Sequence, residues 1–557
     1  TANNNTGIGY NSLAANTTGT QNTSVGANAL DSNTTANNNT AIGFVALGAN
    51  TTGADNTAVG RNALDANTTA SNNVGIGSNA LGANTTGDSN SSLGAFALQS
   101  CETGDDNCAF GRSALQNNTA DFNSAFGKDA LKANTSGTKN VAFGAFTLDA
   151  NTTADHNTGL GYSSLTTNTT GTENVAVGAF ALDANTTANN NTAVGYQSLN
   201  ANQTGNQNTA VGSNSSDTST TAADNVTVGY YCGKGLTTGN HNVAIGSQAF
   251  DVNTTGSQNV AIGKHCMGAN TTANNNVGVG DRALESNTTG TRLVAIGGIS
   301  LNSNSTANDN VGVGYSTLLN CSTGFSNTAV GSYALDAVTD GDNNQAFGHD
   351  ALGACNTGRN NNGFGKQSLR DTTSGGQNNA LGNDALQGVT TGSNNIGIGH
   401  DAGRGNSPSG NITTGSNNIC LGDDNIANLF CADTSISASD SRDKTDIADF
   451  SIGLDWIKAL RPVTYKWDKR SWYGTDTEPY GTPDGSKKKS KINIGFLAQE
   501  ALEVEKANGY GDSSDNMLIC NLTEDGMRYG MKYERLVPIL VNAIKELSVK
   551  VTALEEG

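Results

Sequence analysis

The sequence predicts a mainly β protein, in which a long parallel β-solenoid is followed by a small α/β domain that ends in a coiled coil. Three observations predict it. A 17-residue repeat runs through residues 1–400. Gly, Asn, Thr and Ala dominate that part, and only 14% of the chain is charged. All three Trp lie in the last part of the chain. We therefore expect a shaft at 1–400, a cap and neck at 401–438, and a C-terminal domain at 439–557.

The repeat is defined by a hydrophobic reference residue that precedes an almost unbroken Gly. From Ile8 to Ile398 the spacing is 17 residues, except for one step of 16 residues between Phe110 and Phe126. About 24 units fit this pattern, and a degenerate unit ends at Leu421. High Gly and polarity alone would suggest disorder, but a strict period indicates repeated structure.

Each unit has two apolar columns. Alternation places Thr57 and the reference residue Val59 on one face of a strand, and Ala58 on the other face with the Gly. This second face has almost no side chain, so another backbone can approach it closely. A Leu such as Leu64, five residues after the reference, forms the second column. We expect two short strands and two turns per unit, with other chains packed on the small-residue face.

An Asn recurs three residues before the reference position, as at Asn56 and Asn140, and Leu293 is the exception that we find. Stacked Asn side chains form amide ladders along a fibre, which predicts a structural role rather than a ligand role.

The nine Cys match no disulfide or zinc framework. Cys232 and Cys266 are 34 residues apart, which is two units and too far for a bridge along a solenoid. We expect free thiols, and we predict neither a metal nor a cofactor.

The charge distribution limits the partners. The formal net charge is -19, and 13 basic and 29 acidic residues precede Ser439. This excess of negative charge argues against nucleic acid as a general partner. No segment approaches the 18 apolar residues of a membrane span, so no membrane insertion is expected. The chain begins at Thr1 rather than at an initiator Met, so we expect an N-terminal attachment outside this sequence.

The units Asn-Thr-Ala-Val-Gly and Asn-Val-Ala-Ile-Gly resemble the head repeats of trimeric autotransporter adhesins, which are left-handed parallel β-rolls whose three chains pack side by side. They also look like repeats in bacteriophage tail-fibre shafts. The resemblance implies a homotrimer located on a virion tail fibre or an extracellular surface appendage. It also implies a host surface glycan or protein receptor as the partner.

The C-terminal part has a different pattern. Apolar spacing predicts a helix at 454–460, which Pro462 ends, and alternation predicts a strand at 463–467. A strand that turns into a helix at Gly495 is expected at 492–500. A regular apolar stripe near the end predicts a coiled coil at about 533–555, which we expect to form a three-helix bundle. Its residues are Leu540, Ile544, Leu547, Val551 and Leu554.

Three ordered motifs in this part resemble the endosialidase-type intramolecular chaperone domain, which is found at the C-terminus of phage tail spikes and fibres. The matching residues are Ser439, Asp440, Arg442, Lys444 and Ile447; Leu454, Asp455, Ile457, Leu460, Pro462, Tyr465 and Trp467; and Gly495, Phe496, Ala498, Gln499 and Glu500. The resemblance implies a domain that trimerises, helps the shaft to fold in register, and then cuts itself off with a Ser-Lys dyad.

The resemblance identifies Ser439 and Lys444 as the catalytic residues and the bond between Ala438 and Ser439 as the cleavage site. A Ser hydroxyl is a poor nucleophile until a base removes its proton, and a Lys can act as that base if burial lowers its pKa. The supporting motif consists of Asp440, Arg442, Gly495, Phe496, Gln499 and Glu500. Such an enzyme would act once, and the shaft has no catalytic signature.

Three other functions remain open. A bacterial surface adhesin fits the shaft, although the chain ends in a chaperone-like domain. A polysaccharide depolymerase would need paired carboxylates in a cleft, and scattered acids such as Asp55, Asp88 and Glu173 form no such pair. An ice- or surface-binding solenoid would present Thr on a flat strand, whereas these Thr pairs lie in turns.

Overall fold

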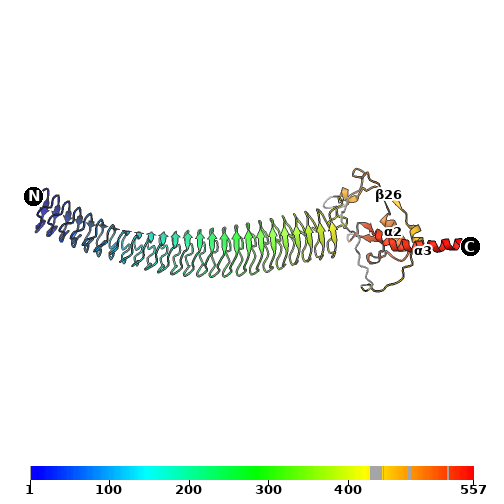
Figure 1. Ribbon diagram of the computed structural model, residues 1–557, viewed down its shortest axis with the longest axis horizontal. Helices are drawn as coiled ribbons and strands as arrows, with labels where there is room; N and C mark the ends of the chain where they lie inside the picture. The colour runs from blue at the N-terminus through cyan, green and yellow to red at the C-terminus, as the bar shows by residue number, and fades with distance from the viewer. Residues whose placement is uncertain are drawn as a thin grey trace. The chain divides into compact units, whose positions relative to one another are not determined.

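The computed structural model describes residues 2–426, 442, 444–474, 478, 480–523 and 526–556. It is mainly β, as predicted, and its dominant element is a parallel β-solenoid with one coil for each 17-residue unit (Figure 1). The chain divides into two compact units, residues 1–323 and 324–557. The division falls inside the repeat.

The first unit consists of solenoid coils, each with one strand of three residues. The strands are β1 (Thr6–Ile8), β2 (Thr23–Val25), β3 (Thr40–Ile42), β4 (Thr57–Val59), β5 (Val74–Ile76), β6 (Ser91–Leu93), β7 (Cys108–Phe110), β8 (Ser124–Phe126), β9 (Val141–Phe143), β10 (Thr158–Leu160), β11 (Val175–Val177), β12 (Thr192–Val194), β13 (Thr209–Val211), β14 (Val226–Val228), β15 (Val243–Ile245), β16 (Val260–Ile262), β17 (Val277–Val279), β18 (Val294–Ile296) and β19 (Val311–Val313).

Neighbouring strands pair in parallel and in register, so Ala58 lies opposite Gly75 in the next coil. The 16-residue step keeps this register, because Phe110 pairs with Phe126. The missing residue is removed from a turn: Asn118 Nδ2 donates to the carbonyl two residues later at 2.7 Å, where other coils span three residues. The solenoid therefore absorbs the deletion without a slip.

Each coil contains one strand, not the two that we predicted. After the strand, Asn62 and Leu64 have φ angles of 55° and 52°, which are left-handed and incompatible with strand pairing. The Leu is nevertheless fully buried, so the second apolar column is confirmed, but it lies on a turn. The left-handed conformation costs an L-residue about 1–2 kcal/mol. Burial of a Leu side chain, worth about 1.5–3 kcal/mol, offsets that cost.

The two strand faces are confirmed, but the prediction that other chains pack on the small-residue face is wrong. Ala58, in the middle of β4, is fully buried and belongs to the same interior cluster as Ala63 and Leu64. Because a 17-residue coil is narrow, only a small side chain fits between the strand and the facing Leu. The small-residue face is therefore the inside of the coil, and the reference residue points outward.

The close backbone approach that Gly predicted occurs between successive coils of the same chain. Gly60 has a φ of 136°, and a Cβ placed on it would lie 2.5 Å from the carbonyl oxygen of Gly77 in the next coil. An L side chain would meet both a steric and a conformational penalty there.

The Asn ladder is confirmed by its hydrogen bonds. The backbone N–H of Asn56 donates to Oδ1 of Asn39 in the preceding coil at 2.9 Å, and its Nδ2 donates to the carbonyl of Ala70 at 2.8 Å. Even Leu293, the exception, keeps the backbone part of the ladder, because its N–H donates to Asn276 Oδ1 at 3.0 Å. The buried side-chain amide of Asn56 is therefore satisfied, because its Oδ1 also accepts the backbone N–H of Asn73 at 2.9 Å.

The Asn of the Asn-Thr-Thr turn forms a second ladder on the other side of the coil. Asn67 Nδ2 donates to Asn50 Oδ1 at 2.9 Å and to the Ala70 carbonyl at 3.0 Å. The hydroxyl of Thr51 donates to the Thr68 carbonyl at 3.0 Å. Hydrogen bonds thus link consecutive coils at the turns as well as at the strands.

The second unit contains the last coils and the C-terminal domain. Its elements are β20 (Thr328–Val330), β21 (Gln345–Phe347), β22 (Asn362–Phe364), β23 (Asn379–Leu381), β24 (Ile396–Ile398), β25 (Ile419–Leu421), α1 (Leu454–Ala459), β26 (Val463–Tyr465), the 3-10 helix η2 (Arg470–Tyr473), β27 (Asn493–Gly495), α2 (Ala498–Ala507), η3 (Ser514–Asn516), β28 (Cys520–Leu522), β29 (Tyr529–Met531), η4 (Tyr533–Arg535) and α3 (Leu536–Glu555).

Strand pairing continues to β25, the last strand of the solenoid, which pairs in parallel with β24. In the C-terminal domain, β26 pairs antiparallel with β27, and β28 pairs antiparallel with β29. The predicted helix at 454–460, the strand at 463–467 and the strand-to-helix segment at 492–500 are therefore confirmed to within a few residues. None of the helices in the described part of the chain has the length and hydrophobicity needed to span a bilayer.

Candidate functional site

The C-terminal elements bring together motifs that are separated in the sequence. Val463 on β26 lies opposite Gly495 on β27, so the second and third predicted motifs share one small sheet. Trp456 on α1 is only 2% exposed and packs in one core with Leu502 of α2 and Ile539 of α3. Of the motif residues, Leu460 belongs to this core, and Ile457 and Phe496 pack against it.

Gly495 makes room for a tyrosine at the base of the last helix. A Cβ on Gly495 would lie 2.5 Å from the Tyr533 hydroxyl oxygen. The backbone N–H of Phe496 donates to the same oxygen at 3.2 Å. Because η4 leads directly into α3, this contact ties the third motif to the start of α3.

Of the other two supporting residues of this motif, Glu500 forms an ion pair and Gln499 lines a cavity. Arg461 Nε donates to Glu500 Oε2 at 3.0 Å, and this hydrogen bond lowers the pKa of the Glu500 carboxyl. Gln499 lines a cavity of about 490 Å³ whose walls also include Asp424 and Arg528. The cavity therefore joins the third motif to residues of the last coil.

The predicted catalytic centre lies at the margin of the described residues. Ala438, Ser439 and Asp440 lie outside them, so the dyad stays a prediction. Arg442 and Lys444 are described, and both are exposed in the single chain. A lysine acts as a base most readily when it is buried, and Lys444 is exposed in the single chain.

A buried carboxylate in α2 holds the polypeptide that leads into β28. Glu505 is fully buried, and its two oxygens accept the backbone N–H groups of Leu518, Ile519 and Cys520 at 3.0, 2.7 and 2.7 Å. Three amide donors satisfy the charge that burial would otherwise leave unpaired. Its role is to join α2 to the second small sheet.

Helix α3 buries one face and exposes another. Leu536, Ile539 and Ala543 are buried against the domain core. The predicted trimerisation stripe is exposed in the single chain, from 42% for Leu540 to 82% for Leu554. Among the described residues, the stripe is therefore largely open to solvent.

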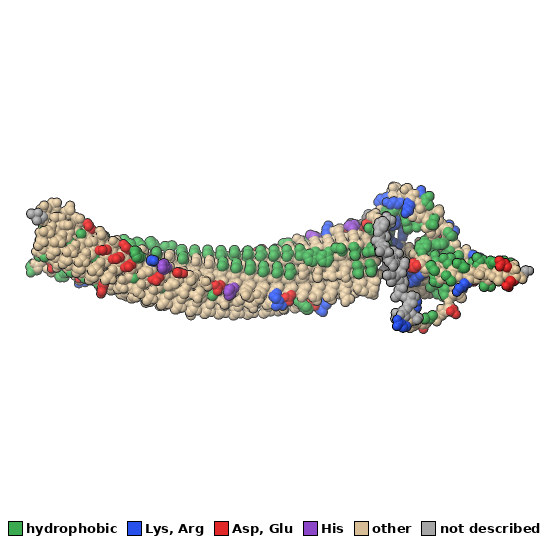
Figure 2. All heavy atoms as spheres, viewed as in Figure 1, with side chains coloured by type: hydrophobic (Ala, Val, Ile, Leu, Met, Phe, Trp, Pro, Cys, Tyr) green, Lys and Arg blue, Asp and Glu red, His purple; other side chains and the backbone are tan. Residues whose placement is uncertain are grey.

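The outward reference column makes a second exposed apolar surface, which we call the outward column. Its most exposed members in the first unit are Ile8, Ile42, Leu93, Phe143, Leu160, Ile245 and Ile296. Figure 2 shows hydrophobic side chains aligned along the coils. Some are in contact with one another, since the rings of Phe110 and Phe126 stack with centroids 5.0 Å apart.

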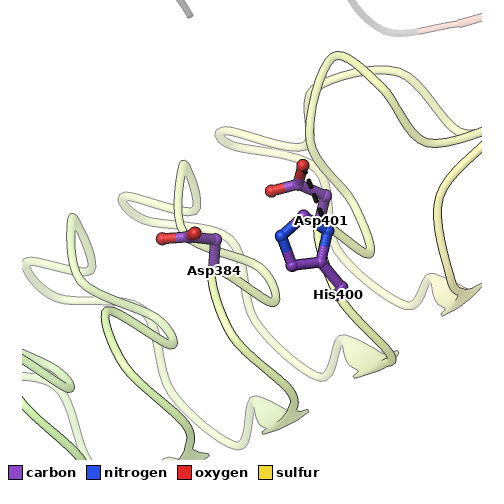
Figure 3. A group of neighbouring side chains, drawn as sticks. All are labelled: Asp384, His400 and Asp401. Atoms are coloured by element: carbon purple, nitrogen blue, oxygen red, sulfur yellow. Dashed lines mark ion pairs between the residues drawn. The ribbon is translucent and has the colours of Figure 1, made fainter.

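Three potential metal ligands gather near the end of the solenoid. The side chains of Asp384, His400 and Asp401 converge, and His400 Nδ1 lies 3.4 Å from Asp401 Oδ2 (Figure 3). The guanidinium of Arg404 supplies a positive charge to the two carboxylates. Its Nη1 is 2.8 Å from Asp401 Oδ1 and 3.8 Å from Asp384 Oδ2. We therefore interpret this cluster as a structural ion-pair network.

The thiols have the character of buried structural groups. All eight described cysteines are free. Burial raises the pKa of Cys101 to about 11 and that of Cys355 to about 12, so thiolate is scarce at neutral pH. These two occupy the turn-Asn position, where Cys101 Sγ lies 3.5 Å from the Gly104 carbonyl oxygen.

The comparison with protein families agrees with this part of the structure. Residues 439–510 match the family described as chaperone of endosialidase. The match starts at Ser439 and includes α1, β26, β27 and α2. No curated protein matches the chain. The chain therefore carries a chaperone-of-endosialidase domain behind a β-solenoid, as the motifs predicted.

Sequence reasoning missed three residues that the structure places at key contacts. Glu505 had a usable signal, because it shares a helix face with Ala501 and Leu502, where a charge is unexpected. Asp424 and Arg528 had none, since each lies in an irregular polar stretch and their contact depends on the fold.

Proposed function

We propose that the chain is a structural fibre protein of a virion tail, or of a similar extracellular appendage, whose C-terminal domain drives trimerisation and folding and then releases itself. The observation that carries this proposal is the chaperone-of-endosialidase match at 439–510, directly after a parallel β-solenoid. A glycan or protein of a host surface would be the partner of the finished fibre.

The regularity of the shaft supports the need for a chaperone. Successive coils have the same interior and the same Asn ladders, so a slip of one coil between chains loses little locally. A domain that gathers three chains at one end sets their register before the coils associate. This requirement follows from the repeat itself.

Two exposed apolar surfaces support a homotrimer. One is the outward column of the coils, and the other is the stripe on α3 that begins at Leu540. Contiguous apolar surface of this kind marks an interaction site. Two further copies of the chain would cover both surfaces. Each copy carries the same column, which repeats once per coil, and the same stripe, which repeats along α3, so like surfaces can face each other.

The proposed cleavage is a single acyl transfer followed by hydrolysis. Lys444 takes the proton of the Ser439 hydroxyl, and the oxygen attacks the carbonyl carbon of Ala438. The C–N bond breaks as an ester forms, and the released amine of Ser439 receives a proton. Water then hydrolyses the ester and leaves a carboxylate at Ala438.

The exposure of Lys444 in the single chain supports an order of events. Lys444 would acquire the burial that a lysine base needs only after neighbouring copies pack on it. Cleavage would then follow assembly, and the fibre would lose its chaperone only when it has folded. After the cut, the assembled fibre is kinetically hard to undo.

Substitution of the nucleophile tests the proposal. Full-length protein should give a shorter shaft fragment on a denaturing gel, with an intact mass that ends at Ala438. Ser439→Ala should remain full length, whereas the neighbouring Ser441→Ala should be cut like the parent. A shaft fragment of unchanged mass from the Ser439→Ala protein would contradict the assignment.

A further inference from the structure

A buried cluster of charges joins the C-terminal domain to the last coil of the solenoid. Arg528, which precedes β29, forms a two-pronged contact with Asp424, which follows β25. Nη1 lies 3.0 Å from Oδ1, and Nη2 lies 2.8 Å from Oδ2. The Asp424 side chain is only 4% exposed and the Arg528 side chain only 17%. Paired, hydrogen-bonded charges of this kind give geometric specificity as well as attraction.

The guanidinium of Arg528 makes further contacts with the same coil. Nη1 donates to the Ser407 carbonyl at 2.6 Å, and Nη2 donates to the Gly405 carbonyl at 2.8 Å. The ring of Tyr480 lies against the guanidinium, 5.2 Å from centroid to Cζ. A lysine could not reproduce this fork of four bonds over an aromatic face.

Two more residues of the C-terminal domain bind Asp424. Lys469 Nζ lies 3.6 Å from Asp424 Oδ1 and donates to its backbone carbonyl at 3.3 Å. The hydroxyl of Ser471 donates to Asp424 Oδ2. Asp424 is therefore the common acceptor for three side chains of the C-terminal domain, those of Lys469, Ser471 and Arg528. We call Asp424 and its partners in this interface the Asp424 cluster.

The cluster crosses the proposed cut in the sequence. Its acceptors lie before residue 427, and its donors lie after residue 468, on the other side of the bond between Ala438 and Ser439. Cutting that bond removes the covalent link between the two sides but none of these contacts. Cleavage alone therefore leaves a formed interface between shaft and chaperone.

We propose that the Asp424 cluster is a docking site that keeps the C-terminal domain on the last coil after the chain has been cut, so that cleavage and release are separate steps. The inference rests on the proposed function, because it concerns the cut protein. Separation of the C-terminal domain from the last coil has to expose the carboxylate of Asp424 and the guanidinium of Arg528, which are paired and buried in the interface. We therefore expect this separation to be slow. In a trimer, three such contacts act together and strengthen retention by avidity.

A protease-cut variant tests docking independently of self-cleavage. The Ser439→Ala protein receives an affinity tag at its N-terminus and a specific protease site inserted after Ala438. The protein is bound to a resin, cut with the protease and washed under native conditions. The fraction of the C-terminal fragment left on the resin is then measured over time. We expect the parent to retain most of its fragment, and Arg528→Met to lose it at least ten-fold faster.

Arg535→Met is the matched control, because its guanidinium donates to the Leu518 carbonyl within the C-terminal domain at 3.1 Å. It should retain the fragment like the parent. Asp424→Asn removes the same contact from the shaft side and keeps the test valid if Arg528→Met folds poorly. Retention by both cluster variants at the parent rate, or immediate loss of the parent fragment, would overturn the proposal.

The two proposals fail in different ways. If self-cleavage is wrong, the unmodified protein stays full length, while the protease-cut variant still reports on docking. If docking is wrong, the unmodified protein is cut, but its fragments separate as fast as those of Arg528→Met.

Discussion

At the scale of single residues, half-buried Asp side chains recur at one position of the repeat and are separated by coils that carry no acid there. The position six residues after the reference carries an acid in alternate coils over part of the shaft. These acids are Asp149, Asp183, Asp217 and Asp251. Burial raises the pKa of each of them. Coils are about 4.8 Å apart, so skipping one coil roughly halves the repulsion between carboxylates.

Asp336 occupies the same position in a later coil and gives a pH prediction. Burial, and then the charge of Asp350, raise its pKa to about 6. The folded state therefore holds this proton more tightly than the unfolded state, whose pKa is near 4. Stability should rise as pH falls from about 6 to 4. We expect Asp336→Asn to raise the melting temperature at pH 7.5, and the gain to vanish near pH 4.

Asp309 is the control for this measurement. The hydrogen bond from Arg292 lowers its pKa, so its charged form is the one that the fold favours. Asp309→Asn should give no gain at pH 7.5 when melting is followed by circular dichroism. A gain from Asp336→Asn that is the same at pH 4 and pH 7.5 would contradict the burial argument.

At the scale of the coil, the apolar side-chain volume in the interior is conserved even where the sequence departs from the repeat pattern. In one coil the Leu position is Gly233, with a φ of 61°, and the turn-Asn position is Leu236, which is fully buried. The apolar side chain has moved three residues along the chain and still fills the interior. A narrow coil tolerates such an exchange because the interior needs the volume, not the particular position.

In the C-terminal domain, Glu505 is the contact whose loss should cost most. Its carboxylate accepts three backbone amides that lead into and begin β28. Glu505→Ala leaves the buried N–H groups of Ile519 and Cys520 unpaired, at about 1–3 kcal/mol for each such group. We expect the tryptophan fluorescence transition of this domain to shift to much lower urea concentration.

Glu503→Ala, on the same helix, is the matched control for Glu505→Ala. Glu503 is exposed and forms a surface ion pair with Lys506, worth about 0–1 kcal/mol. The two variants should therefore differ clearly in their urea midpoints. Equal midpoints would mean that Glu505 does not join α2 to β28.

At the scale of the whole molecule, stability comes from stacking. Each coil buries little by itself, and its hydrogen bonds run mainly to the coils before and after it. The repeat cannot specify a partner register, because all coils offer similar surfaces. Within this sequence, the C-terminal domain is the part that departs from the repeat, so we expect the chain register to be set there.

The stripe on α3 provides the assembly prediction. Ile544 is 66% exposed and has no role in the buried face of α3. We expect Ile544→Asp to convert the assembled protein into a single chain, because a charge in a three-helix core is not compensated. Sedimentation velocity would measure this change. The helix itself should survive, since Leu536 and Ile539 still pack on the domain core.

Lys545→Asp is the control for the assembly prediction. Lys545 lies next to Ile544 on α3, is exposed and is not part of the stripe. This variant should sediment like the parent. An Ile544→Asp protein that keeps the parent mass would contradict the proposed bundle.

Much of the architecture followed from the sequence because its causes are local and repeated. The spacing of Leu64 from Val59 predicted a buried column, and the recurrence of Asn56 predicted an amide ladder. Helix α1 and strand β26 were visible from their periodicities and from Pro462. The catalytic assignment at Ser439 and Lys444 is what the family resemblance implies, and it stays a prediction.

The sequence by itself therefore determined the coil period, the ladders and the nature of the C-terminal domain. Only the tertiary structure decided that Ala58 faces inward and Val59 outward, because a period of two looks the same from either side until the coil closes. The left-handed φ of Leu64, which leaves one strand per coil, follows from the same closure. The pairing of Asp424 with Arg528 was decided there too, since residues 104 apart meet only when the domain lies on the last coil.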